Sequence, residues 1–403
     1  RGRWRAAASL ALASALFAVT GADGPPGGPW PPGATPAGWR PWLVSVGSGT
    51  YAEPGCVRPV AGALYCTERM GGRLYRFDAA TGRALWKVWY ADDDLVTPTV
   101  VAVSSDVVLV RRDSTDATPA LRLDAVDAAT GAPLWHRSLT AETFPTSPLA
   151  DMAGGVAVVA IQGTVTGYDA RSGKRLWTHR TGGGDECRLQ MLGLTAVAGC
   201  GTVGEDKATM VTAAYSVRDG EPRWSTSHPY YLYPMVAGAG RIVVGVLHTT
   251  GDGPDRTGVL DPDTGRVTLL AQGPGPGALP DEEGVIVGDV YYQASDDSSV
   301  SALDLRTGAR LWRERLRFDN PSRPVVAADR IYVTTPTGRV AALDRATGDP
   351  LWYSEPPEGT RTTSSGIESP PSLVGDVLYV PCGGGVVYSL DVTAPEPGPP
   401  ARA

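Results

Sequence analysis

The sequence has few of the residues from which most enzyme centres are built. Among its 403 residues there are only five cysteines and four histidines. The histidines, at His136, His179, His228 and His248, show no spacing that suits a metal site. The chain also lacks a Gly-x-Ser-x-Gly nucleophile motif and a Gly-x-x-x-x-Gly-Lys phosphate loop. We therefore expect no metal centre, no activated nucleophile and no nucleoside triphosphate site.

Basic charge is scarce as well. Acidic residues number 43 against 36 basic ones, and the only lysines are Lys87, Lys174 and Lys207. A nucleic-acid partner would require a basic surface, so the net charge of −7 argues against one. Only four phenylalanines occur, whereas 50 glycines and 35 prolines interrupt the chain. This composition disfavours long helices and favours many short strands joined by turns.

The N-terminal residues have the pattern of an export signal. Arg1, Arg3 and Arg5 precede an uncharged run that extends from residue 6 to residue 22. A basic end followed by about 15 apolar residues is typical of a secretory signal peptide; a short membrane anchor is the alternative. No Leu-x-x-Cys motif precedes the Pro- and Gly-rich linker at 23–38, which argues against a lipid anchor. We expect an extracytoplasmic protein, either secreted or anchored to the membrane through residues 6–22.

One short phrase recurs seven times along the chain. Its full form runs from Phe77 through Asp78, Thr81 and Gly82 to Trp86. Asp-x-x-Thr-Gly is turn chemistry, and apolar strand residues flank it, so each copy predicts a β-hairpin. The adjacent Leu and Trp point to opposite faces of the second strand, and we expect them to enter different packing layers. Further copies carry Asp127 with Trp135, Asp169 with Trp177, Asp304 with Trp312, and Asp344 with Trp352; degenerate copies carry Ser216 with Trp224 and Asp261 with Leu269.

The spacing of the copies predicts the fold. Successive Trp positions are separated by 49, 42, 47, 45, 43 and 40 residues. A period of this length built only from strands is typical of β-propeller blades. An eighth repeat reaches Asp391 without a following Trp, while Trp42 begins a strand 44 residues before Trp86. We predict an all-β, eight-bladed propeller of four-stranded antiparallel blades, closed by the N-terminal strand near Trp42; a seven-bladed ring is the alternative if the copy at Leu269 is no blade.

The phrase from Leu303 to Trp312 resembles the tryptophan-docking repeat of the PQQ-like, quinoprotein-type β-propellers. The resemblance covers about residues 40–393. It implies that the repeat tryptophans pack between adjacent blades and donate a hydrogen bond to the neighbouring blade. Leu269 departs from the pattern and has no indole N–H, so the contact of its blade with the next should be weaker. The positions to which the resemblance assigns the docking role are Trp86, Trp135, Trp177, Trp224, Trp312 and Trp352.

The PQQ-like propellers include both enzymes and binding proteins. Its dehydrogenases hold pyrroloquinoline quinone (PQQ) and calcium beside a disulfide between adjacent cysteines; other members are scaffolds in outer-membrane assembly or sensor domains of receptor Ser/Thr kinases. No two cysteines are adjacent here, and no acidic run at 92–94, 281–283 or 296–297 has the spacing of a calcium loop. The repeat aspartates lie in turns, where a structural role is expected. We therefore predict no bound cofactor.

The cysteines suggest two structural disulfides. Cys56 and Cys66 flank the first hairpin of the first blade, and Cys187 and Cys200 flank the equivalent hairpin of the fourth. Cross-strand cysteines in such hairpins are within bonding reach, and export would keep the bonds oxidised. Cys382 would then be free; five buried thiols are the alternative.

These observations lead to one functional hypothesis. Residues 39–393 form a non-catalytic, extracytoplasmic propeller that binds a protein, cell-envelope or small-molecule ligand as a scaffold or sensor, followed by a disordered tail at 394–403. A PQQ-dependent oxidoreductase is the alternative. Longer connections at 111–118, 249–256 and 355–368, and the aromatic cluster at 228–233, are the candidate recognition sites because binding residues concentrate on loops of rigid scaffolds.

Overall fold

The computed structural model describes most of the predicted propeller. Its described residues are 35–47, 54–68, 72–90, 95–114, 120–140, 150–202, 209–247, 256–270, 284–295, 297–358, 360, 369–394 and 401–402. The predicted signal or anchor at 1–22, most of the linker at 23–38 and most of the tail at 394–403 lie outside these residues. In the described part of the chain, no helix is long and apolar enough to cross a membrane.

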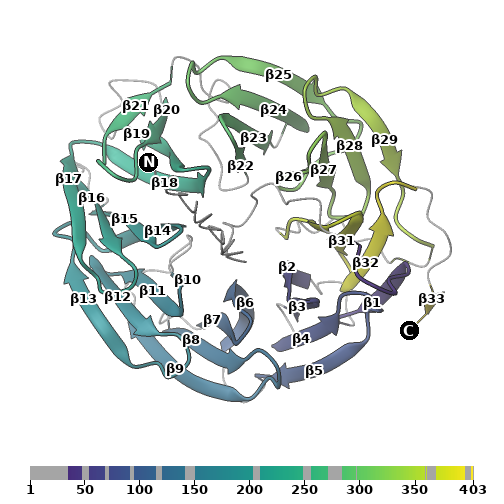
Figure 1. The fold of residues 1–403 in the computed structure, drawn as a ribbon, viewed down its shortest axis with the longest axis horizontal. Helices are drawn as coiled ribbons and strands as arrows, with labels where there is room; N and C mark the ends of the chain where they lie inside the picture. Colours follow the sequence, from purple (N-terminus) through teal and green to yellow (C-terminus); the bar gives the residue numbers. More distant parts are fainter. Residues whose placement is uncertain are drawn as a thin grey trace, which may run out of the picture.

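The described strands form eight sheets arranged as a ring of blades around a central axis, as Figure 1 shows. In seven of these blades the four strands pair antiparallel in chain order, from the axis outwards, and the eighth takes strands from both ends of the chain. Blades 1 to 4 consist of β2 (Pro54–Val60), β3 (Ala63–Glu68), β4 (Arg73–Asp78) and β5 (Ala84–Trp89); β6 (Leu95–Val103), β7 (Val107–Ser114), β8 (Ala120–Asp127) and β9 (Pro133–Thr140); β10 (Ala150–Ala153), β11 (Val156–Ile161), β12 (Thr164–Asp169) and β13 (Arg175–Arg180); and β14 (Glu186–Leu192), β15 (Thr195–Thr202), β16 (Thr209–Ser216) and β17 (Pro222–His228). Blades 5 to 8 consist of β18 (Tyr231–Gly238), β19 (Arg241–Leu247), β20 (Arg256–Leu260) and β21 (Val267–Leu269); β22 (Gly284–Val287), β23 (Val290–Ser295), β24 (Ser299–Asp304) and β25 (Arg310–Arg315); β26 (Val325–Val326), β27 (Arg330–Thr334), β28 (Val340–Asp344) and β29 (Pro350–Ser354); and β30 (Ser372–Val374), β31 (Val377–Cys382), β32 (Val386–Asp391) and β1 (Trp42–Ser45).

The last blade is completed from the other end of the chain. β1 pairs antiparallel with β32, with Leu43 opposite Tyr388. A short fifth strand, β33 (Ala401–Arg402), runs parallel to β1 on its outer side. The predicted closure by the N-terminal strand is therefore confirmed, and it joins the first blade to the last. The seven-bladed alternative is wrong, because the degenerate copy at Leu269 forms the outer strand of a complete blade 5.

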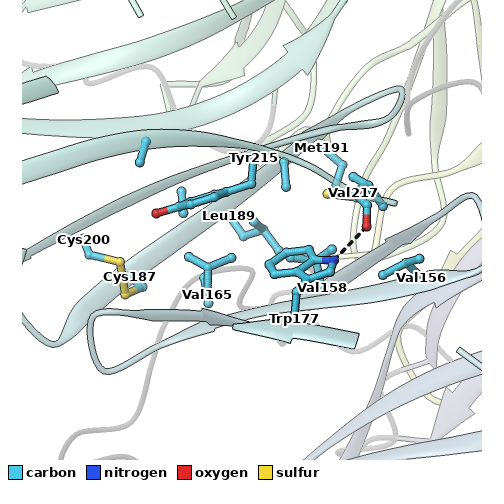
Figure 2. Close-up of a cluster of buried hydrophobic side chains, with 14 residues drawn as sticks. Val156, Val158, Val165, Trp177, Cys187, Leu189, Met191, Cys200, Tyr215 and Val217 are labelled. Carbon is cyan, nitrogen blue, oxygen red and sulfur yellow. Dashed lines mark hydrogen bonds between the residues drawn. A yellow bond between two sulfur atoms is a disulfide. The ribbon is translucent and has the colours of Figure 1, made fainter. Parts of the chain in front are cut away.

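The hydrophobic core lies between neighbouring blades rather than at the axis. One buried cluster combines Val158 and Val165 of blade 3 with Leu189 and Tyr215 of blade 4 (Figure 2). The second and third strands of a blade are covered on both faces, which explains why strands such as β3 are buried at every position.

The outermost strands are covered on one face only. In blade 3, Trp177 of β13 is 8% exposed, whereas its neighbour Leu176 is 45% exposed. The expectation that both residues enter packing layers is therefore wrong for the leucine, because the outer strand lies at the rim. Alternation along these strands leaves Leu85, Leu176, Leu311 and Leu351 exposed on the other face.

The two faces of the ring carry different loops. On one face, which we call the turn face, the first hairpin turn of most blades contacts the turn that follows the third strand, as in the hydrogen bond from the Ala128 amide to the Asp106 carbonyl at 3.0 Å. The opposite face, the connection face, carries the turns between second and third strands and the connections from blade to blade. There the Thr181 amide donates to the Gly163 carbonyl at 2.8 Å. All predicted loop extensions connect strands at this face, although most of their residues lie outside the described ones.

Candidate functional site

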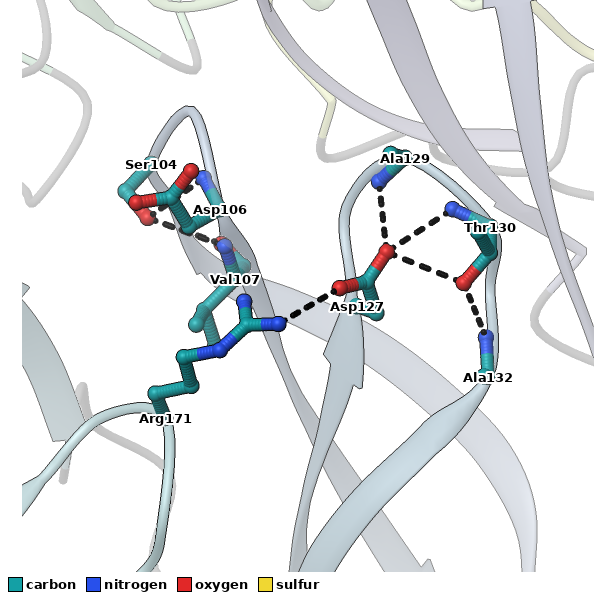
Figure 3. A network of polar contacts seen from close by, with 8 residues as sticks. All are labelled: Ser104, Asp106, Val107, Asp127, Ala129, Thr130, Ala132 and Arg171. Carbon is teal, nitrogen blue, oxygen red and sulfur yellow. Dashed lines mark hydrogen bonds and ion pairs between the residues drawn. The ribbon is translucent and has the colours of Figure 1, made fainter.

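The repeated aspartates are occupied within their own turns. In blade 2, Oδ1 of Asp127 accepts hydrogen bonds from the amides of Ala129 and Thr130 and from the Thr130 hydroxyl, at 3.1, 3.0 and 2.9 Å (Figure 3). The second oxygen, Oδ2, lies 3.3 Å from the guanidinium of Arg171 in the neighbouring blade. The Thr130 hydroxyl and amide bonds lower the pKa of Asp127 and keep it ionised. A carboxylate used in this way orders a turn and is not placed to act on a ligand.

The repeated tryptophans join each blade to the next. Nε1 of Trp177 in blade 3 donates to the carbonyl of Val217 in blade 4 at 3.0 Å (Figure 2). The indole lies against Gly220 of the same turn, where an added Cβ would come within 2.5 Å of the ring. Equivalent bonds at 2.7 to 3.2 Å run from Trp42 to Ala79, Trp86 to Ala128, Trp135 to Ala170, Trp224 to Pro262, and Trp312 to Arg345.

Two contacts between blades depart from this pattern. Leu269 is 42% exposed and offers no donor to blade 6; on the turn face of this contact, Arg241 of blade 5 pairs with Asp289 of blade 6. Trp352 of blade 7 packs against blade 8, but its buried Nε1 has no partner among the described residues. The carbonyl at the equivalent acceptor position, that of Val392, instead lies 3.5 Å from the guanidinium of Arg330.

Two disulfides staple inner strands near the connection face. Cys56 in β2 is bonded to Cys66 in β3, and Cys187 in β14 is bonded to Cys200 in β15. Each pair occupies directly opposed positions of an antiparallel ladder, with Cα atoms 4.1 Å apart. Cys382 is a free, buried thiol whose hydrogen points to the Val386 carbonyl at 3.4 Å. Burial raises its pKa to about 12, so it is unreactive at neutral pH.

The described side chains do not fit PQQ and calcium. The two disulfides join cysteines that are 10 and 13 residues apart in the sequence, respectively, and lie on neighbouring strands. The quinoprotein site is expected to need cysteines that are adjacent in the sequence. Within the described ranges no group of three or more His, Cys, Asp or Glu side chains could hold a metal ion. Of the acidic runs considered above, only Asp297 is described, and it accepts from the Ser299 hydroxyl at 2.6 Å and pairs with Arg313.

The aromatic cluster at the start of blade 5 combines rings with one cation on the connection face. The guanidinium of Arg188 lies 4.7 Å above the ring of Tyr233, which in turn stacks on Tyr231. His228 is 7% exposed, and its Nε2 has no partner among the described residues. Burial lowers the pKa of His228, so the imidazole is neutral and can bond to a donor or an acceptor. Tyr231 and Leu232 are buried, so part of the cluster packs the blade.

A second polar cluster lies between blades 1 and 2 and was not predicted from the sequence. Arg112 is only 2% exposed, and its Nε donates to Oδ2 of Asp124 at 2.5 Å. Arg122 donates to the other carboxylate oxygen at 2.9 Å, and the Arg112 guanidinium lies 4.7 Å above the Tyr90 ring. The Tyr90 hydroxyl has no partner in the described part of the chain, and burial raises its pKa. The signal for this cluster was Asp124, which stands three residues before the turn aspartate, where every other blade carries an uncharged residue.

Comparison with known proteins gives consistent matches. A family model described as outer membrane protein assembly factor BamB matches residues 70–231 and 255–394. The BamB protein of Burkholderia pseudomallei is 27% identical over 371 residues, which cover 87% of both chains. The Ser/Thr protein kinase AfsK of Streptomyces coelicolor is 31% identical over 209 residues, which are 51% of this chain but 23% of the kinase.

Solved structures match the whole ring. BamB from Moraxella catarrhalis has a TM-score of 0.53 at 19% identity, covering 87% of this chain and 99% of that protein. A quinohemoprotein alcohol dehydrogenase from Comamonas testosteroni has a TM-score of 0.54 at 15% identity, covering 90% of this chain and 77% of the enzyme. At these identities the likeness concerns the fold alone.

Proposed function

Because the chain belongs to the family of PQQ-like propellers described as outer membrane protein assembly factor BamB, we propose that it is a non-catalytic, extracytoplasmic β-propeller that binds a protein partner. The role is that of a scaffold or of the sensor part of a receptor. The first is suggested by the name of the BamB relatives and the second by the kinase relative.

The observation that carries this proposal is the use of the repeated polar groups. Oxygens of Asp127, and of its equivalents such as Asp344, are held by the amides and hydroxyls of their own turns. The indole N–H of Trp177 is likewise bonded to the next blade. The chemistry that recurs around the ring therefore builds the ring, which supports a binding role rather than a catalytic one.

The disulfides support an extracytoplasmic location. Stable structural disulfides persist in oxidising compartments and are rare in the cytosol. Both bonds, Cys56–Cys66 and Cys187–Cys200, lie in the blade interiors and join inner strands, where they stiffen the connection face near the axis.

The connection face is the binding face in this proposal. Arg188 and Tyr233 pair a cation with an aromatic ring, a combination that is enriched where proteins bind one another. The His228 ring lies 5.4 Å from the ring of Tyr230, which is partly exposed at the same connection between blades 4 and 5.

Photo-cross-linking tests the binding face. A benzophenone amino acid in place of Tyr230, which is partly exposed beside His228, should yield one defined protein adduct in intact cells. The double substitution R188A and Y233A should abolish the adduct. A matched probe in place of Arg180, on the outer strand of blade 3, should not form it. An adduct that is indifferent to R188A and Y233A would contradict the assigned face.

The enzymatic alternative has a direct assay. We predict that reconstitution with PQQ and calcium gives no dye-linked oxidation of alcohols or sugars, because neither adjacent cysteines nor a metal-ligand cluster exists in the described residues. The control is a quinoprotein dehydrogenase reconstituted in the same buffer. Turnover above the background without PQQ would overturn the non-catalytic proposal.

A further inference from the structure

The outer strand of blade 1 carries an aromatic side chain where the other blades are polar. Trp89 of β5 lies three residues after the docking Trp86 and is 66% exposed, more than any other large apolar side chain in the described residues. Because the repeat has constant internal spacing, the other blades serve as internal controls. Their residues at the same position are Ser45, Ser138, Arg180, Ser227, Gln272, Arg315 and Glu355. An exposed tryptophan is therefore a property of blade 1 and not of the repeat.

Trp89 is part of a continuous row. Leu85, Lys87 and Trp89 alternate along β5 and are all exposed on the same face, and we call this row the β5 ridge. Arg73 on the neighbouring strand lies 5.8 Å from the Trp89 ring and is held in place by Glu68 at 2.7 Å. Within the ridge the cation of Lys87 therefore lies between two apolar side chains, Leu85 and Trp89. No ion pair of Lys87 occurs within the described residues.

The backbone of this ridge is at the edge of its sheet. β5 is the last strand of blade 1 and lies on the rim of the ring (Figure 1). The amide of Tyr90 donates inwards to the Gly72 carbonyl at 2.8 Å. Because the hydrogen-bonding direction alternates along a regular strand, the amides and carbonyls of Lys87 and Trp89 point outwards, on the Tyr90 side of the bulge at Leu85. These groups are available to pair with a further strand.

β5 is also less protected than most of the other edges. Proteins blunt exposed edges with proline or charge. Strands β9, β17 and β29 begin with proline, and β13 and β25 each carry at least two arginines. β5 has no proline and a single charge, Lys87, and the three-residue β21 has neither proline nor charge. Blade 8 shows that an outer edge of this ring accepts a fifth strand, because β33 pairs with β1 there.

We propose that the outer edge of blade 1 is a docking site for an extended segment of a partner protein. The segment adds to β5 as a fifth strand and carries apolar, acidic and apolar side chains at every second position, so that the three lie on one face. Its apolar residues contact Leu85 and Trp89, and its carboxylate pairs with Lys87. Charge complementarity selects this occupant, since the ridge exposes a cation and no acid. The inference rests on the proposed binding function and adds to it a second surface, on the rim rather than on the connection face.

Synthetic peptides test the site. The probe is a fluorescein-labelled nine-residue peptide that carries valine, glutamate and valine at every second residue, with threonine between them; the controls are a scrambled peptide of the same composition and one with lysine for glutamate. Fluorescence anisotropy with the intact chain should show saturable binding of the alternating acidic peptide only. W89S should weaken binding by about tenfold or more, as expected for an aromatic hot spot. The matched control R180S, at the same position of blade 3, should bind as the wild type does.

Two further measurements separate strand pairing from non-specific contact. K87E should reject the acidic peptide and accept the lysine peptide, because the charge pair is reversed. Two peptides that are N-methylated on opposite sets of alternate residues should differ in affinity. One set of amides pairs with β5, so its methylation should weaken binding, whereas the other set faces solvent. Far-UV circular dichroism and the thermal midpoint of each variant verify that it is folded.

Each outcome decides the proposal. Equal binding by W89S and wild type, no saturable binding of the acidic peptide, or equal effects of the two methylation patterns would overturn it. Dimerisation of the chain that W89S abolishes would also overturn it, because the occupant would be a second copy. The cross-linking from position 230 is independent of W89S, so loss of the rim site leaves the proposed function standing, whereas loss of both would remove the function too.

Discussion

At the scale of single residues, the glycine of the repeat satisfies two constraints at once. Gly173 of blade 3 has φ of +67°, a conformation that L-residues with side chains rarely adopt. An added Cβ would also lie 2.6 Å from Cγ of Trp135, the docking residue of blade 2. The turn conformation and the contact between blades therefore depend on the same missing side chain.

A pair of glycine substitutions in blade 3 separates these constraints. Gly155 has φ of +78° with nothing within 4 Å of an added Cβ. We predict that G155A costs about 1–2 kcal/mol of unfolding free energy from backbone strain alone. G173A should cost about 1–3 kcal/mol more, because the indole of Trp135 must move. Urea unfolding of both variants measures the difference; equal losses would show that the indole contact has no energetic weight.

At the scale of strands, each disulfide fixes one hairpin at the inner edge of its blade. The Cys56–Cys66 and Cys187–Cys200 bonds join opposed positions of strands that are already paired. The stabilisation then comes mainly from limiting the unfolded chain, for loops closed across 10 and 13 residues. The inner strands of blades 1 and 4 are therefore joined both by backbone hydrogen bonds and by a disulfide. In blade 8 the cysteine, Cys382, remains a buried thiol.

Alkylation and unfolding test this arrangement. We predict one alkylated cysteine in denaturant without reductant and five after reduction, counted by mass spectrometry. Under native conditions Cys382 should react slowly, since it is buried and its pKa is raised to about 12. Replacing Cys187 and Cys200 together by serine should cost about 2–3 kcal/mol of unfolding free energy. Five alkylated cysteines without reductant would contradict both bonds.

At the scale of the whole molecule, the ring is joined by contacts of unequal strength. The described contact between blades 3 and 4 buries an indole and bonds its N–H. Between blades 5 and 6 the indole is replaced by the half-exposed Leu269, and a partly exposed ion pair of Arg241 with Asp289 bridges the turn face. Exposed ion pairs contribute about 0–1 kcal/mol, and salt screens them. This contact should therefore be the weakest of the ring.

Hydrogen exchange can locate that weak contact. We predict that the free energy of opening measured for the amides of β21 and β22 is lower than that for the amides of β13 and β14. High salt should increase this difference in opening free energy, because it screens the ion pair between blades 5 and 6. D289N should lower the opening free energy at blades 5 and 6 by about 0.5–1 kcal/mol without changing blades 3 and 4. W177L is the matched variant and should cost about 2–3 kcal/mol at blades 3 and 4. Uniform exchange around the ring would contradict the unequal contacts.

Prediction from the sequence succeeded where the information is local and repeated. A turn such as Asp127 to Ala132 is held by bonds within six residues, so its conformation can be recognised from one copy. Trp42 could be placed in the last blade because a four-stranded repeat cannot end with three strands without leaving an open edge. The polar cluster of Arg112, Asp124 and Tyr90 could not be predicted, because it joins residues from two blades that have no shared motif.

By itself, the sequence determined the all-β class, the eight repeats, their hairpin turns and the closure of the ring, because each depends on residues at a constant spacing. Only the tertiary structure decided which side chains remain without partners. It left Trp89 exposed at a position that is polar in every other blade, and within the described residues it gave the indole N–H of Trp352 no acceptor. Exposure and hydrogen bonding depend on how neighbouring blades are set against one another, and the repeat specifies that arrangement only on average.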